Sequence, residues 1–177
     1  MIKVKTISAI CIILTISFSG CKHDIEDKIN EMMSSPINLS MFSNVKQACD
    51  YKLISVYDST VCSRCVINRI HEWNYWADTL SKYNTSIHLI FCPKVNDKDF
   101  IKATIEKEDF AWCTYIDSCY SFFKANPRIP QDPRFHTFLV NDNDSVILVG
   151  NPTRNQKIEE LMFTILRNSK EKKGSDI

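Results

Sequence analysis

Short apolar runs of strand length recur through the middle of the chain. Residues 53–57 form the first run, and residues 87–92 form the second, which Pro93 ends. Two later runs, 137–140 and 145–149, flank an Asn-Asp-Asn-Asp tetrapeptide whose residue types tolerate a positive φ. The first two runs therefore predict buried strands, and the last two predict a β-hairpin.

Helical periodicity fills the intervals between these runs. Apolar residues recur at spacings of three and four after the first run, within 97–109, and in 118–125. A third short strand is predicted at 111–116, and Thr153 with Gln156 has the spacing of a capping box that would open a last helix. Strand–helix–strand units followed by a hairpin and a helix predict an α/β fold with a mixed sheet and helices on both faces. The apolar positions of the first and last helices are Val66, Ile70, Trp73, Ala77 and Leu80, and Ile158, Leu161, Met162, Ile165 and Leu166.

The N-terminus has the layout of an export signal. Two lysines within the first five residues precede an apolar stretch at 7–18, which is too short to span a bilayer comfortably. Residues 18–21, Phe-Ser-Gly-Cys, resemble a bacterial lipobox, whose Cys is lipidated and becomes the mature N-terminus. We therefore expect a lipoprotein signal peptide at 1–20 and a lipid on Cys21. An ordinary secretory signal or a single anchoring helix remains the alternative.

The rest of the chain divides into three parts. Residues 21–36 are polar and are expected to tether the lipid to the domain, although their scattered apolar positions also fit a short amphipathic helix. Residues 37–168 form one domain, and 169–177 form a charged tail expected to be disordered. Export places the domain in the bacterial cell envelope, lipid-anchored on the periplasmic side or at the cell surface, where disulfides persist.

Charge and composition exclude several function classes. The chain has 22 Lys and Arg against 21 Asp and Glu, so no excess of positive charge indicates a nucleic-acid partner. It contains only three glycines and neither a P-loop nor a dinucleotide-binding pattern. We therefore expect no cofactor.

The motif Cys62-Ser63-Arg64-Cys65 follows the first predicted strand and opens the first predicted helix. Thiols three positions apart at the start of a helix lie close enough to form a disulfide, and Ser59 or Thr60 is expected to cap that helix. Cys62 is expected to be the attacking thiolate because it is nearest the helix N-terminus, and Cys65 would resolve the mixed disulfide. The order strand, CxxC, helix is typical of redox motifs, and a structural disulfide that caps a helix is the alternative.

Over residues 36–168 the chain resembles thioredoxin-like proteins of the TlpA/redoxin type. The resemblance is carried by the active-site loop at 57–65 and by the late hairpin, 137–141 with 145–150. The Gly-Asn-Pro ending of that hairpin is similar to a subset of envelope lipoproteins with this fold. The resemblance implies a three-layer sandwich and thiol–disulfide exchange. Two positions depart from the family: Phe135 stands where the family has a cis-proline, and no Trp precedes the first Cys.

Two residues would favour the Cys62 thiolate. Arg64 places a cation beside the pair, and His136 lies on the loop that faces the CxxC in this family. Either cation would make the oxidised pair easier to reduce. An exposed solubilising charge is the alternative for Arg64, and a strand-edge histidine without a catalytic role is the alternative for His136.

The remaining cysteines allow several pairings. Cys113 and Cys119 are candidates for a bridge, Cys49 and Cys92 pair only if the fold brings them together, and Cys92 alone fits a small buried apolar position. A zinc site on the CxxC would need further ligands such as His71 with Cys113. The usual second ligand pair is absent from the sequence, and we expect no metal.

The sequence predicts an envelope-anchored thiol–disulfide oxidoreductase. It would act on thiols or disulfides of exported proteins and be recharged by a membrane redox partner. The alternative is a non-catalytic thioredoxin-fold lipoprotein that binds a partner protein. A thiol peroxidase fits less well, because the loop before Cys62 contains Thr60 but no Pro.

Overall fold

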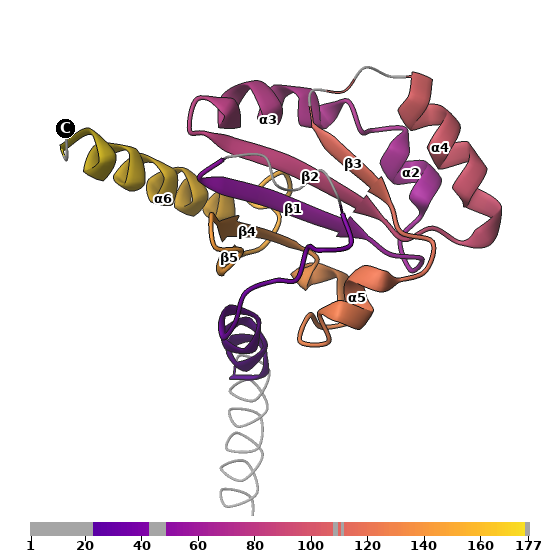
Figure 1. Ribbon diagram of the computed structural model, residues 1–177, viewed down its shortest axis with the longest axis horizontal. Helices are drawn as coiled ribbons and strands as arrows, with labels where there is room; N and C mark the ends of the chain where they lie inside the picture. The colour runs from indigo at the N-terminus through magenta and orange to yellow at the C-terminus, as the bar shows by residue number, and fades with distance from the viewer. Residues whose placement is uncertain (1–22, 43–48, 108–109, 111, 176–177) are drawn as a thin grey trace, which may run out of the picture.

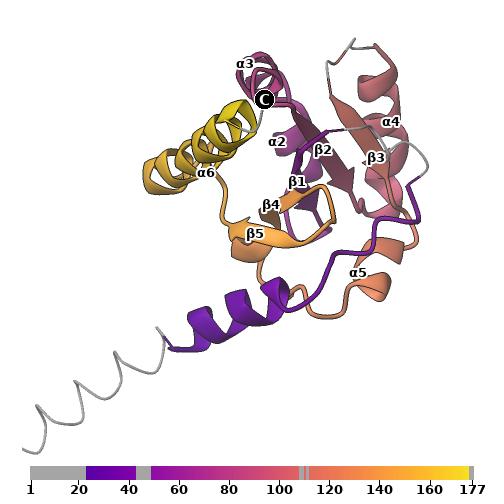
Figure 2. The same cartoon turned by 60° about the vertical axis from the view of Figure 1, so that its left-hand side comes forward.

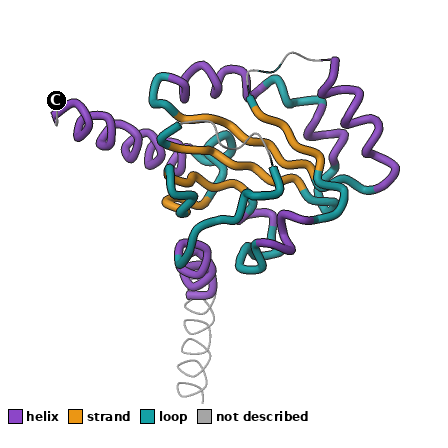
Figure 3. The backbone as a smooth tube through the Cα atoms, viewed as in Figure 1, coloured by secondary structure: helices purple, strands orange, loops and turns teal. Residues whose placement is uncertain are grey.

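A five-stranded sheet organises the fold of this computed structural model (Figure 1). The structure describes residues 23–42, 49–107, 110 and 112–175. Strands and helices alternate along the chain as the apolar pattern predicts (Figure 3). In order they are β1 (Tyr51–Tyr57), α2 (Ser63–Ile67), α3 (Glu72–Ser81), β2 (Thr85–Phe91), η1 (Val95–Asp97), α4 (Lys98–Lys107), β3 (Cys113–Ile116), α5 (Ser121–Ala125), η2 (Pro133–Phe135), β4 (Thr137–Asn141), β5 (Val146–Val149) and α6 (Gln156–Ser175).

The strands lie in the order β3-β2-β1-β4-β5. β1 runs parallel to β2 and β2 parallel to β3, because helices carry the chain back between them. β4 is antiparallel to both β1 and β5, which confirms the predicted hairpin. The Asn141 side chain closes its turn by accepting the backbone N–H groups of Asn143 and Ser145 at 3.1 and 2.9 Å, and Asp144 adopts a φ of +59°. This order and mixture of directions is the predicted thioredoxin-like α/β fold.

Helices cover both faces of the sheet, as predicted (Figure 2). α2, α3, α4 and α6 cover one face, where Trp76 of α3 stacks on Phe163 of α6 with 6.0 Å between ring centroids. α5 and the helical residues 23–33 cover the other face, where Phe122 and Met32 are buried. β1 and β2 have apolar neighbours on both sides, and their sequences are therefore nearly continuous apolar runs.

Two helix boundaries differ from the prediction. The single helix expected after the CxxC is divided into α2 and α3, because backbone bonds between residues three apart, such as Ile70 to Ile67, replace the α-helical pattern at 68–71. The capping box predicted at Thr153 is wrong, since Thr153 donates to Asn151. Asn155 caps α6 instead by accepting the backbone N–H of Lys157 at 3.0 Å, and Asn is a stronger cap than Thr.

Both segments predicted to flank the domain contain helix: residues 23–33 of the expected tether and residues 169–175 of the expected tail are helical. Residues 23–33 lie within the expected tether, yet they bury Met32 and pack Ile25 and Ile29 on the core, so this segment is more than a spacer. α6 continues to Ser175, although we expected disorder from 169. Its Lys and Glu residues are good helix formers, and the side chain of Lys170 donates to the Lys82 carbonyl oxygen at 3.4 Å.

The signal peptide at 1–20 and the lipid site at Cys21 lie outside the described residues. Among the helices that the structure describes, none combines the length and the apolar composition needed to cross a bilayer.

Candidate functional site

Cys62 and Cys65 lie where β1, the central strand of the sheet, leads into α2. The two residues are joined by a disulfide, and their Cα atoms are 5.2 Å apart. Both are exposed, at the carboxyl end of the parallel strands β1 and β2. The sulfur atoms are therefore together, as their spacing predicted, and a second molecule can reach them.

Cys62 itself caps α2, so the prediction that Ser59 or Thr60 would cap this helix is wrong. The backbone N–H of Cys65 donates to the Cys62 sulfur at 3.3 Å. This bond favours a thiolate over a thiol, because hydrogen bonds to charged acceptors are the stronger ones. Thr60 instead directs its backbone N–H and its hydroxyl to the Asp58 carboxylate, at 2.9 and 2.5 Å. Asp58 thereby fixes the loop that leads into Cys62.

Arg64 points away from the disulfide toward α4. Its Nε lies 3.1 Å from the carboxylate of Asp97, and its guanidinium carbon lies 4.9 Å from the centroid of the Phe100 ring. The Arg64 side chain is 60% exposed. Its charge is therefore partly balanced by Asp97 and screened by water, which reduces its effect on the sulfur atoms.

His136 is buried beneath the loop that carries the CxxC. Its Nε2 lies 2.9 Å from the carbonyl oxygen of Pro130, and because a carbonyl only accepts, Nε2 carries the proton. Its Nδ1 lies 3.9 Å from the carboxylate of Asp58 and makes no hydrogen bond with any described residue. Nδ1 thus faces Asp58, the anchor of the loop, and the ring lies with its centroid 5.0 Å from that of Phe123. Phe135, at the family's cis-proline position, is buried in η2, and no described residue follows a cis peptide bond.

A pocket of about 150 Å³ lies beside the disulfide, between the start of α2–α3 and the loop after β5. The apolar side chains of Val61 and Val66 line this pocket, together with Tyr57. The Trp73 indole N–H donates to the Tyr57 hydroxyl at 3.2 Å. Burial raises the pKa of Tyr57, although this hydrogen bond opposes the shift, so the hydroxyl stays neutral. The pocket offers a recess with both polar and apolar walls for a side chain next to the disulfide.

Asp58 and Tyr57 lie in the predicted active-site loop at 57–65, but neither was predicted to have a role of its own in the site. An Asp two positions before Thr is a signal for the side-chain turn that Asp58 makes, and this pattern could have identified it. Tyr57 has no comparable signal, because its partner Trp73 comes from a different element.

The other described cysteines remain thiols. Cys49 contacts Ser86 at the start of β2, whereas Cys92 follows its end, so the pair is separated by about 20 Å of strand. Burial, with the charges of Asp117 and Asp58, raises the pKa of Cys92 to about 12, and this thiol is inert. Cys113 begins β3 and Cys119 lies beyond its end, and they are not bridged.

A zinc site on the CxxC receives no support. Within the described ranges no three His, Cys, Asp or Glu side chains are grouped so that they could hold a metal ion. His71 is an exposed residue at the start of α3, and Cys113 begins β3 at the opposite end of the sheet from the disulfide.

No protein-family model and no curated protein matches this chain. Solved structures with similar folds include a thioredoxin-like protein from Bacteroides caccae, with 15% identity and a TM-score of 0.45 over 67% of this chain. The chain covers 42% of the length of that protein.

Two further structures are similar at the same level. The C-terminal domain of an uncharacterized protein from Bacteroides fragilis has 12% identity and a TM-score of 0.46, with 67% of this chain and 81% of that chain covered. An uncharacterized thioredoxin-like protein from Porphyromonas gingivalis has 17% identity and a TM-score of 0.47, with 71% and 78% covered. The fold assignment rests on the strand order of the sheet.

Proposed function

We propose that this protein is a thiol–disulfide oxidoreductase of the cell envelope that exchanges disulfides with exported proteins through Cys62 and Cys65. The observation that supports this most is an exposed disulfide, next to the centre of a thioredoxin-like sheet, whose Cys62 sulfur receives the Cys65 N–H. This donor is fixed by the backbone and is in place before any substrate arrives.

Exchange would proceed in two steps from the reduced pair. The Cys62 thiolate attacks one sulfur of a substrate disulfide, an S–S bond forms as the substrate bond breaks, and the leaving thiolate takes a proton from water. The Cys65 thiolate then attacks the Cys62 sulfur and releases the second substrate thiol. Two electrons pass to the substrate, and a membrane redox partner would supply two electrons to reduce the Cys62–Cys65 disulfide again. In the reverse direction, the same steps oxidise a substrate dithiol.

The surface next to the disulfide suits a protein partner. Val95 in η1 is 91% exposed, and the same short helix supplies Asp97 to Arg64, which places it beside α2. Phe100 of α4 is also an exposed apolar residue. Apolar side chains around an exposed disulfide provide contact area for a polypeptide that presents its own cysteine.

The proposal includes attachment to the membrane through a lipid on Cys21. Residues 18–21 and the apolar stretch before them support it. Metabolic labelling with a radioactive fatty acid tests this part: the wild-type chain would carry the label, and a Cys21→Ala chain would not.

A second candidate is a non-catalytic lipoprotein that uses the same face to bind a partner protein. The ion pair between Arg64 and Asp97 favours it, because the cation expected to assist the thiolate is engaged elsewhere. A binding module does not need a reactive Cys62, so the reactivity of this thiol distinguishes the two candidates.

Trapping of a mixed disulfide tests the proposed function. The Cys65→Ser variant, mixed with a peptide that contains one disulfide, should accumulate a covalent adduct on Cys62, because no thiol remains to resolve it. Cys62→Ser is the matched control and should trap nothing. If Cys65→Ser forms no more adduct than Cys62→Ser, the oxidoreductase proposal is wrong and the binding module replaces it.

A further inference from the structure

The pocket beside the disulfide is lined by charged side chains as well as apolar ones. Two of them are arginines, Arg69 and Arg154, and one is a glutamate, Glu72. All three are exposed. Arg69 and Glu72 come from the start of α3 and the turns before it, whereas Arg154 comes from the loop after β5. Two segments far apart in the sequence therefore bring a net positive charge to the edge of the CxxC.

The turn that carries Arg154 is fixed by hydrogen bonds. Thr153 donates its backbone N–H and its hydroxyl to the Asn151 side chain at 2.9 and 2.8 Å, and the backbone N–H of Arg154 donates to the Asn151 carbonyl oxygen at 3.2 Å. Just before them, the N–H of Gly150 donates to the carbonyl oxygen of Thr137 in β4 at 2.8 Å. The backbone that presents Arg154 is thus tied to the sheet before a substrate arrives, which lowers the ordering cost of binding.

The negative and positive charges of the pocket differ in how they are balanced. Glu72 is the first residue of α3, where the unpaired N–H groups of the helix N-terminus stabilise a carboxylate. Between described residues, no ion pair joins Arg69 or Arg154 to a carboxylate. Arg64, by contrast, is paired with Asp97. Two guanidinium groups next to the disulfide therefore remain available to a carboxylate of another molecule.

Tyr57, which lines the pocket, reports which charge acts more strongly there. Burial has the largest influence on the pKa of its hydroxyl and raises it. Of the two nearby charges, Arg154 lowers the pKa of Tyr57 more than Glu72 raises it. The positive charge thus predominates at this wall of the pocket, and a negative group placed there would be attracted.

The size of the pocket indicates the kind of group that it accepts. Its volume of about 150 Å³ is roughly half the lower limit of the 300–1,000 Å³ that small-molecule sites occupy. It corresponds to about five water molecules, enough for a single side chain. Val61 directly precedes Cys62, and Val66 directly follows Cys65, so a side chain in the pocket lies beside the disulfide. A polypeptide that exchanges with Cys62 can supply such a side chain.

We propose that this pocket selects substrate polypeptides that carry an Asp or Glu two positions from the cysteine they exchange. The inference rests on the proposed function and names the substrate class of the same site. In an extended chain, side chains two positions apart point the same way and lie about 7 Å apart. When the substrate cysteine faces Cys62, the acidic side chain therefore faces the protein as well. Its carboxylate accepts hydrogen bonds from the guanidinium groups of Arg154 and Arg69.

Short peptides test this selection. Each has blocked termini and one cysteine, held as a methyl disulfide, with Glu, Gln or Lys two positions before or after it, so that the side chain under test is the only carboxylate. They react with the full chain carrying Cys65→Ser. The Cys62 thiolate attacks the peptide sulfur, a Cys62–peptide S–S bond forms as the methyl disulfide breaks, and methanethiolate leaves and takes a proton from water. Mass spectrometry measures the rate at which the peptide adduct forms on Cys62.

At low ionic strength the Glu peptide should form the adduct about 5-fold faster than the Gln peptide in at least one placement, which is the size of effect that an exposed ion pair gives. The Lys peptide should be slower than the Gln peptide. About 1 M NaCl should abolish most of the preference, because it shortens the Debye length to about 3 Å. Equal rates for Glu and Gln in both placements would overturn the inference alone. Absence of adducts with every peptide would contradict the proposed function and the inference together.

Arg154→Gln tests whether this guanidinium carries the selection. The ratio of the Glu rate to the Gln rate is compared within each variant, so that any change in the reactivity of Cys62 itself cancels. This ratio should fall toward 1 in Arg154→Gln. Arg167→Gln is the matched control, since Arg167 is an exposed arginine of α6 outside this pocket, and it should keep the wild-type ratio.

Charge reversal provides the sharpest test. Arg154→Glu should react faster with the Lys peptide than with the Gln peptide, which is the opposite of the wild-type order. Arg69→Gln measures the share of the second guanidinium, and its ratio should fall less than that of the double variant with Arg154→Gln. If the double variant retains the wild-type preference for Glu, the pocket does not select the substrate and the inference is wrong.

Discussion

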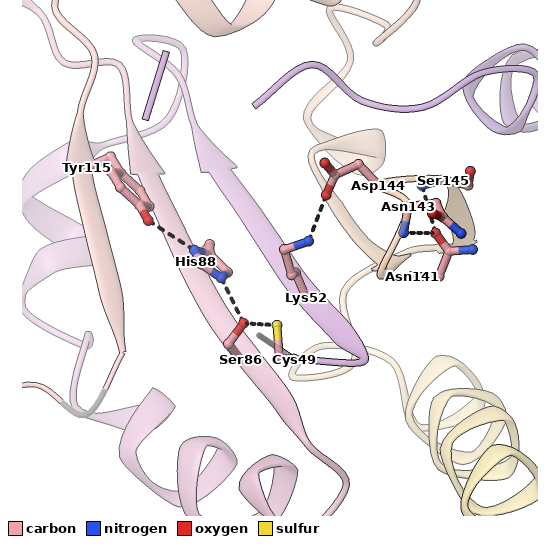
Figure 4. Close-up of polar contacts among 9 residues, drawn as sticks. All are labelled: Cys49, Lys52, Ser86, His88, Tyr115, Asn141, Asn143, Asp144 and Ser145. Carbon is pink, nitrogen blue, oxygen red and sulfur yellow. Dashed lines mark hydrogen bonds and ion pairs between the residues drawn. The ribbon is translucent and has the colours of Figure 1, made fainter. Parts of the chain in front are cut away.

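The two ends of the parallel strands carry sulfur atoms in contrasting settings. At the carboxyl end Cys62 and Cys65 are exposed, close in sequence and joined by a disulfide. At the opposite end Cys49 and Cys113 are half-buried thiols far apart in sequence, and Ser86 and His88 link Cys49 to Tyr115 (Figure 4).

The two ends differ in what positions their thiols. The CxxC depends on the backbone of one loop and one helix, and its electrostatic support is the N–H of Cys65. At the opposite end the placement depends on the register of β2 and β3, which sets His88 opposite Cys113 and two residue pairs away from Tyr115. Changes at one end should therefore leave the other end intact, and the predictions below test this separation.

The largest expected effect is the loss of exchange in Cys62→Ser. Reduction of a peptide disulfide by the reduced protein should fall about 100-fold or more, because the attacking thiolate is removed. Cys119→Ser is the control and should retain the wild-type rate, since its thiol lies outside the CxxC. Activity that survives in Cys62→Ser and is lost in Cys49→Ser would transfer the function to the opposite end of the sheet.

Lowering the pH should destabilise the folded protein, because His88 is buried and neutral. Its pKa is about 4 in the folded protein and 6.5 in the unfolded chain, so its contribution is complete above pH 6.5 and is lost as the pH falls toward 4. The loss amounts to about 3 kcal/mol of unfolding free energy. Urea unfolding from pH 7.5 to pH 4 measures it.

The His88→Phe variant should be less dependent on pH over this interval, because a phenyl ring takes up no proton. His71→Asn, at an exposed position, is the control and should follow the wild type. If wild type and His88→Phe lose stability in parallel between pH 6.5 and 4, the account of His88 is wrong.

Gly150→Ala should destabilise the loop that follows β5 and borders the CxxC pocket. Gly150 has a φ of +133°, and an added Cβ would lie 2.9 Å from Cδ1 of Ile158. We expect a loss of about 1–3 kcal/mol in unfolding free energy. Adding Ile158→Val removes the contacting methyl group and should recover part of the loss, whereas full stability in Gly150→Ala alone would contradict this account.

Arg64→Gln should have the smallest effect. Because the guanidinium is exposed and paired with Asp97, the reduction potential of the CxxC should change by less than about 20 mV. Asp97→Asn, which leaves the Arg64 charge unbalanced, is the matched comparison. A change of more than about 50 mV in Arg64→Gln would restore the sequence-based role of this residue as a modulator of the thiolate.

The sequence predicted the features that depend on local spacing. The strand before Cys62, the disulfide spacing and the hairpin around Asn141 each follow from residues close together in the chain. The division of the helix at 68–71 was not predicted, because the apolar pattern continues across it and only the backbone bonds change.

The features that depend on strand register could not be predicted. Asp97 reaches Arg64 from another helix, and His88 meets Tyr115 only because β2 and β3 pair in one register. Neither contact has a signature in spacing. The network around His88 can therefore be recognised only in the folded structure.

The most direct test of the central claim is the reduction potential of the Cys62–Cys65 pair, measured in glutathione buffers with Cys62→Ser as the reference. We predict a reversible two-electron transition between about −120 and −270 mV that is absent from the variant. A midpoint near the negative limit would identify a reductant, and one near the positive limit an oxidant. If no transition belonging to this pair occurs in the accessible range, the disulfide is structural and the oxidoreductase account is contradicted.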